Sequence, residues 1–215
     1  METIDFTLPK RLFSNNNVND KLIIKAVDCH AGGEPARIVF SGVPKFPDHC
    51  NTALLKRKYM MENLDYIRQI LLQEPRGYPC QNVDYIFKQN DNEIQYVIGE
   101  QNKIYPLMSG HNTICAATAV LECGVVSMNE PITKFIMEAP AGPIEITAQC
   151  ENGKAKSIAL KNAPSFVEYL DIVVDVPHGN IGKVKLDIAY GGMWYAVVDL
   201  SQFDNVKHLN MTLDT

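Results

Sequence analysis

The segment over residues 111–123 constrains the fold of this chain most, because it is apolar on nearly every side. Placed at helical spacing, its alanine, valine and leucine residues leave almost no polar face. A helix that is hydrophobic all round has to be buried. Gly124 follows as a natural C-terminal stop. We therefore expect this helix to form the centre of a domain, with the other elements wrapped around it.

Most of the remaining regular segments are predicted to be short strands. They cover residues 22–27, 36–40, 84–87, 94–98, 134–137, 144–148, 157–160, 172–174, 184–188 and 193–198. A further helix is predicted over residues 52–72, where apolar residues recur every three to four positions until Pro75 and Gly77 end it. This pattern predicts an α+β protein whose sheet curls around the central helix.

Composition excludes several classes of function. The chain has 215 residues, of which 46% are hydrophobic and 21% charged, as is typical of a globular protein. The formal net charge of −5, without a basic cluster, argues against a nucleic-acid partner. No apolar stretch reaches the roughly 18 residues of a membrane span, and no signal peptide is evident, so we expect a cytoplasmic protein with no membrane partner. Residues 1–21 are interpreted as a loose leader.

No metal site is expected either. The six cysteines form no C-x-x-C pair, and no pair of histidines has the spacing of metal ligands. We interpret Cys115, which lies within the buried helix, as a small core residue.

The start of the buried helix is polar and contains Ser109, Gly110, His111 and Asn112. The first backbone N–H groups of a helix lack helical partners, and together with the helix dipole they attract an anion such as a carboxylate. Gly110 would let a ligand approach the backbone closely. The other interpretation is that Ser109 or Asn112 merely caps the helix. The two are compatible, because a capping residue can also face a ligand.

Several segments resemble motifs of the proline racemase family, and they occur in the family's order. Residues 106–114, P-L-M-S-G-H-N-T-I, resemble its M-C-G-H-x-T segment, with serine in place of cysteine. Residues 30–39 are similar to its H-T-G-G-E-P-x-R-I-V opening, residues 74–77 match E-P-R-G, and residues 187–196 resemble D-I-A-[FY]-G-G-x-[FW]-Y-A. The resemblance covers about residues 22–200 and identifies the chain as a member of this family.

The resemblance implies a fold like that of diaminopimelate epimerase. Two similar halves each curl a sheet around a central helix, the active site lies between them, and each helix start supplies one catalytic residue. We expect residues 22–155 to form the first half and residues 156–215 to begin the second. Ser109 would hold the first catalytic position, and Gly110 and His111 would contact the substrate carboxylate. The substrate would be a small imino acid, proline or a hydroxyproline, and no cofactor is implied. A homodimer is left open.

Serine at position 109 departs from the family's usual cysteine. A serine hydroxyl is far less acidic than a thiol, so it is a poor partner in two-thiol racemisation. The resemblance associates serine here, with cysteine at the second position, with dehydration of trans-3-hydroxy-L-proline. The second residue would take the Cα proton, and Ser109 would assist departure of the 3-hydroxyl. Hydroxyproline 2-epimerisation and proline racemisation are the alternatives.

The family's second motif, of the form D-R-x-P-[CT]-G-[ST]-G, does not occur before Thr215. We therefore expect the chain to end before the second catalytic residue, whose identity stays unknown. A truncated, non-catalytic family member is the alternative from a different class. We expect His30 to stabilise its turn, with a place in the cleft as the alternative. We expect Glu34 and Arg37 to form a structural ion pair, with a role in substrate binding as the alternative.

Overall fold

The computed structural model describes residues 22–90, 93–177 and 181–203. The expected leader at residues 1–21 lies outside these ranges. The chain divides into two compact units, Met1–Ala163 and Pro164–Thr215. The division falls later than the boundary expected after residue 155, because strand β7 (Lys154–Lys161) pairs with β6 (Gly142–Glu151) in the sheet of the first unit.

The first unit contains a seven-stranded sheet whose strands follow one another in chain order. Besides β6 and β7 it contains β1 (Lys25–Ala31), β2 (Glu34–Ser41), β3 (Asn82–Asn90), β4 (Glu93–Gly99) and β5 (Ile132–Ala139). The pairs β2–β3 and β4–β5 are parallel, and the others are antiparallel. Parallel neighbours require crossover connections, and both crossovers carry helix.

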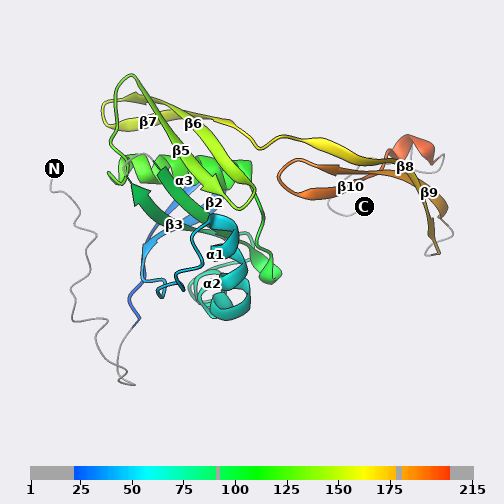
Figure 1. Cartoon of the computed structure of the whole chain (residues 1–215), viewed down its shortest axis with the longest axis horizontal. Helices are drawn as coiled ribbons and strands as arrows, with labels where there is room; N and C mark the ends of the chain where they lie inside the picture. Colours follow the sequence, from blue (N-terminus) through cyan, green and yellow to red (C-terminus); the bar gives the residue numbers. More distant parts are fainter. Residues whose placement is uncertain (1–21, 91–92, 178–180, 204–215) are drawn as a thin grey trace. The chain divides into compact units, whose positions relative to one another are not determined.

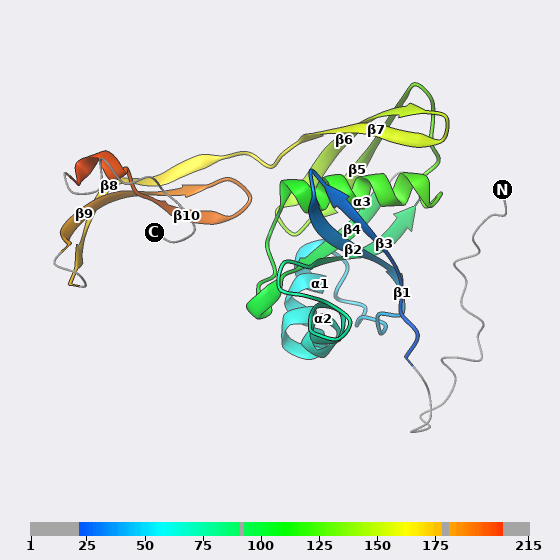
Figure 2. The same cartoon turned by 180° about the vertical axis from the view of Figure 1, so that it is seen from behind.

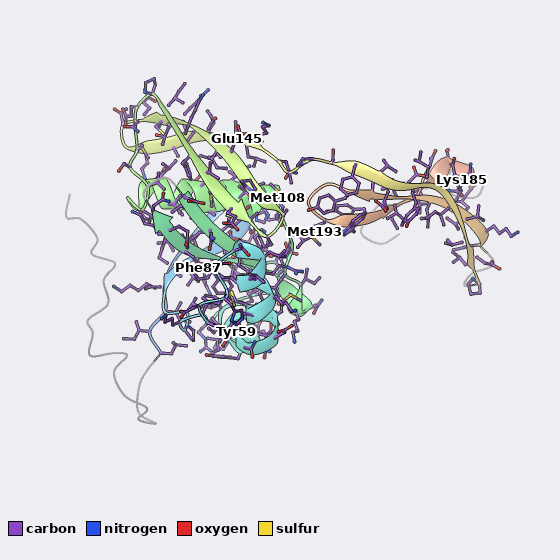
Figure 3. The ribbon with its side chains drawn as sticks, viewed as in Figure 1. Tyr59, Phe87, Met108, Glu145, Lys185 and Met193 are labelled. Carbon is purple, nitrogen blue, oxygen red and sulfur yellow. The ribbon has the colours of Figure 1, made fainter. Side chains whose placement is uncertain are left out.

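The first crossover is the helical segment predicted over residues 52–72. It consists of α1 (Ala53–Tyr59), a π-helical stretch (Met60–Leu64) and α2 (Asp65–Leu72). The Thr52 hydroxyl caps its start by accepting from the Leu55 N–H at 3.2 Å. This segment packs on one face of the sheet. Tyr59 and Phe87, which Figure 3 labels, both lie on this face. Each meets the ring of Phe46 edge-on, with centroids 5.7 and 5.1 Å away.

The second crossover contains α3 (Gly110–Glu122), which packs on the other face of the curled sheet (Figures 1 and 2). Ala117 and Val120 are fully buried, so the prediction of a buried central helix is confirmed. Gly124 follows with φ of 72°, a left-handed conformation that glycine adopts without strain. The buried hydrophobic residues form two clusters, one on each face of the sheet. Successive residues of β3 and β4 point to opposite faces, so each of these strands contributes to both clusters.

The first observed strand, β1, differs from the strand predicted over residues 22–27. The strand begins later than residue 22 and continues to Ala31, which pairs with Glu34 across Gly32 and Gly33. These glycines have φ of 62° and 98°. His30 Nδ1 accepts from the Gly33 N–H at 3.3 Å, as expected for a residue that stabilises this turn.

The second unit has a three-stranded antiparallel sheet in the order β10–β9–β8. Its strands are β8 (Phe166–Val176), β9 (Gly182–Tyr190) and β10 (Trp194–Val197). The strand predicted over residues 172–174 extends back to Phe166 across an irregularity at Asp171, whose φ is 56° and whose N–H donates to Asp187 Oδ1 at 2.9 Å. Within the described ranges, no helix is long and apolar enough to cross a membrane.

Candidate functional site at the start of the central helix

Ser109 is the residue immediately before α3, and its backbone is extended, with φ of −143° and ψ of 126°. Its side chain does not cap the helix, because it makes no hydrogen bond to a backbone N–H. Instead its Oγ accepts from the side-chain amide of Asn112 at 3.0 Å. The interpretation of Ser109 as a simple side-chain cap is therefore not supported. Ser109 is half-buried, and the side chain that bonds to its hydroxyl, Asn112, is buried in the core.

Gly110 begins the helix and is exposed. A Cβ added to it would meet no atom within 4 Å, so packing among the described residues does not require glycine here. Its conformation does not require glycine either, because Gly110 is not among the residues with positive φ. The backbone N–H groups of Gly110 and His111 belong to the first turn, where a helix has no internal acceptor for them. An anion could therefore reach these groups closely.

His111 is half-buried and lies beside Glu34, with 3.8 Å between Nδ1 and Glu34 Oε1. Its Nε2 is buried and has no hydrogen-bond partner among the residues that the structure describes. The expected pair of Glu34 with Arg37 is wrong. The Arg37 guanidinium instead binds both oxygens of Asp28, at 2.7 and 2.9 Å, and donates to the Leu71 carbonyl at 2.7 Å.

Further carboxyl groups lie at the same edge of the sheet as the start of α3. Glu34 begins β2, Asp84 is near the start of the parallel strand β3, and Glu100 follows the end of the antiparallel strand β4. Burial raises the pKa of Glu100; the charge of Glu34 acts in the same direction, and His111 acts against it. Sequence patterns placed these residues at strand ends but held no sign that the charges of Glu34 and Glu100 act together with His111.

Asp84 is fully buried, and neither of its oxygens has a hydrogen-bond partner in the described part of the chain. Burial raises the pKa of its carboxyl group well above the ordinary range, and the nearby Cys29 and Glu100 add to this shift. An unpaired carboxylate in such a place would be very costly, so burial favours the neutral form of this group.

Cys115 is confirmed as a core residue, because it is only 1% exposed. Cys29 Sγ contacts its carbonyl oxygen at 3.7 Å. The neighbouring Cys29 thiol, together with burial, raises the pKa of Cys115 above its usual value. Cys115 therefore does not replace the missing thiol of position 109. Among residues 22–90, 93–177 and 181–203, no histidine, cysteine, aspartate and glutamate side chains gather as a metal site would require.

Several known proteins are similar to this chain in sequence and in fold. The family model described as "Proline racemase" matches residues 26–211. A 4-hydroxyproline 2-epimerase of Rhizobium etli is 37% identical over 196 residues, which is 90% of this chain and 54% of that protein. A proline racemase of Acetoanaerobium sticklandii is 38% identical over 200 residues, which is 88% of this chain and 59% of that protein.

A solved structure gives the same picture. A hydroxyproline epimerase from Agrobacterium vitis, crystallised with bound trans-4-hydroxy-L-proline, is 33% identical, with a TM-score of 0.74 over 85% of this chain and 52% of that chain. These similarities place the chain in the class of α+β proteins whose curled, half-barrel sheet encloses a helix. The chain belongs to the proline racemase family. It spans about half the length of the curated relatives that it matches.

The Gly110→Ala variant separates folding from ligand binding at this site. We expect it to unfold at the same or a higher temperature, because alanine gains about 0.4–1 kcal/mol where it fits without strain. We also expect affinity for trans-3-hydroxy-L-proline to fall by about tenfold or more, equivalent to about 1.4 kcal/mol, because the methyl group would stand between ligand and backbone. Thermal unfolding and calorimetric titration measure the two effects. Unchanged affinity would remove Gly110 from the site.

The Asp84→Asn variant tests the buried carboxyl group. The unfolded pKa is about 3.9 and the folded pKa is raised, so the wild type gains stability from protonated Asp84 below about pH 4. That contribution is lost as the pH rises toward the folded pKa, by about 1.4 kcal/mol per pH unit. The free energy of unfolding of the variant, relative to the wild type, should therefore increase from pH 4 upward. Urea unfolding at several pH values measures this difference, and parallel curves would contradict a neutral, buried Asp84.

Proposed function

We propose that this chain carries the first-half site of a cofactor-independent enzyme that dehydrates trans-3-hydroxy-L-proline. The backbone N–H groups of Gly110 and His111 bind the substrate carboxylate, and Ser109 acts as proton donor to the departing 3-hydroxyl. The observation that carries the proposal is the hydroxyl of Ser109 at the helix start, where the family motif usually has a thiol. The names of the relatives support an imino-acid substrate, because they are a 4-hydroxyproline 2-epimerase and a proline racemase.

The charges around α3 are compatible with a zwitterionic imino acid. The helix start attracts the carboxylate through its N–H groups and its dipole. Glu34, which lies beside His111, attracts the positively charged ring nitrogen, and the charge of Glu100 acts in the same region. Opposite charges on one small ligand would thus meet opposite charges on the protein, which favours one orientation of the ring.

The proposed reaction removes one molecule of water. A base that the motifs of this chain do not supply takes the Cα proton, and the electron pair of that bond forms the Cα–Cβ double bond. The bond between Cβ and the 3-oxygen breaks, and the oxygen leaves as water with the proton of Ser109. Ser109 regains a proton through solvent from the protonated base. The enamine product then tautomerises to a pyrroline carboxylate.

Hydroxyproline 2-epimerisation or proline racemisation is the nearest alternative, and the printed names of the relatives favour it. Either reaction requires a second proton donor to Cα on the opposite face of the ring. Ser109 serves that role poorly because its hydroxyl is much less acidic than a thiol. The alternative of a non-catalytic member predicts that imino acids bind at α3 without turnover.

The variants Ser109→Ala and Ser109→Cys distinguish these functions. In a protein that also contains the family's second motif, we expect Ser109→Ala to lower kcat for trans-3-hydroxy-L-proline by roughly 10²–10⁴-fold, the usual contribution of a general acid, with little change in KM. We expect Ser109→Cys to gain exchange of the Cα proton of trans-4-hydroxy-L-proline and L-proline. Pyrroline formation and loss of an α-deuterium measure these reactions.

Unaltered dehydration by Ser109→Ala would show that Ser109 takes no part in the chemistry. Wild-type epimerisation without dehydration would favour the alternative named by the relatives. If a protein that contains both motifs binds imino acids but turns over none of these substrates, the non-catalytic alternative is correct.

A further inference from the structure

Fully buried side chains beneath Ser109 hold it in place. Asn112, Thr113 and Tyr96 are each 0% exposed, and all belong to the core around the start of α3. Asn112 and Thr113 both contact Ser109, one at its side chain and the other at its backbone. Residue 109 is therefore fixed at two points by groups that cannot turn toward solvent.

The backbone contact has a defined direction. The Ser109 carbonyl accepts from the Thr113 N–H at 3.0 Å and from Thr113 Oγ1 at 2.6 Å. A hydroxyl group has one proton, so Thr113 cannot also donate to Tyr96. The Tyr96 hydroxyl must therefore be the donor in its 2.6 Å contact with Thr113 Oγ1. Burial raises the pKa of Tyr96, which keeps this donor protonated.

The side-chain contact also has a defined direction. The Asn112 amide nitrogen can only donate, so Ser109 Oγ is the acceptor of the 3.0 Å bond. The hydroxyl proton of Ser109 must then point away from Asn112, and it is available to an acceptor outside the core. The amide oxygen of Asn112 is buried and has no hydrogen-bond partner in the part of the chain that the structure describes. A buried polar group is normally hydrogen-bonded, so an unpaired amide oxygen at this place calls for a functional explanation.

We propose that Asn112 is a positioning residue that makes Ser109 a proton donor. Its N–H directs the Ser109 proton outward, and it stabilises the negative charge on Oγ when that proton leaves. A hydrogen bond to a charged oxygen is about twice as strong as one between neutral groups, so this contact strengthens as charge develops. The role rests on the proposed dehydration, because it assigns to Ser109 the acid step of that reaction.

A test that does not depend on turnover uses Ser109→Cys, which introduces the residue type usual in the family motif. The Asn112 N–H should stabilise the introduced thiolate, and alkylation by iodoacetamide over a range of pH reports the apparent pKa of this thiol. Peptide mass spectrometry separates the introduced thiol from the six native cysteines. Asn112→Asp and Asn112→Ala are then added to Ser109→Cys. The control is Thr133→Val, a buried hydroxyl that bonds to Asn129 rather than to α3.

We expect Asn112→Ala to reduce alkylation of the introduced thiol near neutral pH by about tenfold, and Asn112→Asp, which keeps the shape of the side chain but repels a thiolate, to reduce it further. Thr133→Val should leave it unchanged. If Asn112→Ala does not fold, the near-isosteric aspartate variant gives the same test. Alkylation that is equal in the parent and in the folded Asn112 variants would overturn the proposal, as would an equal loss in Thr133→Val.

Activity separates this inference from the proposed function. In a protein that retains Ser109 and also contains the family's second motif, Asn112→Asp should lower kcat for dehydration by at least about tenfold, with a smaller change in KM. Reduced thiol reactivity together with a wild type that shows no dehydration would refute the proposed function and leave the orientation of Ser109 standing. Active dehydration with unchanged thiol reactivity would refute the role of Asn112 alone.

Discussion

The burial of α3 is the constraint on which the rest of the first unit depends. A helix with no polar face can be stable only if it is enclosed, and the enclosing surface here is the curled seven-stranded sheet. The helix connects the parallel strands β4 and β5, so its start lies at the edge where β2 and β3 begin and β4 ends. Burial of the helix therefore also brings its polar first turn to that edge.

The same enclosure fixes the positions of the groups at the helix start. Asn112 and Thr113 belong both to the core and to the site, because they are fully buried and yet bond to Ser109. Residues exposed at the edge supply charge, as Glu34 does beside His111. The buried Asn112 and Thr113 hold Ser109 in place. A ligand that binds here would meet a backbone and a hydroxyl whose positions the core has already fixed, which lowers the entropic cost of ordering them.

The elements were predictable where the sequence pattern alone determines them. The apolar helix, the polar residues before it and most strands follow from periodicity and turn residues. Contacts that depend on strand register did not follow: Arg37 binds Asp28 because β1 and β2 pair those residues, and that leaves Glu34 to His111. The bond from Asn112 to Ser109 depends on a side-chain conformation that no pattern reveals. The backbone is irregular at Asp171 and the register of β8 shifts nearby, so the sequence pattern did not predict the first part of this strand.

We propose that the first turn of α3 binds the carboxylate of an imino acid. Titration of the ¹⁵N-labelled protein with trans-3-hydroxy-L-proline, followed by the chemical shifts of backbone amides, measures this binding residue by residue. The largest shifts should occur at the amides of Gly110 and His111, and 3-hydroxypyrrolidine, which lacks the carboxylate, should not reproduce them. Shifts confined to other residues, or equal shifts with 3-hydroxypyrrolidine, would contradict it.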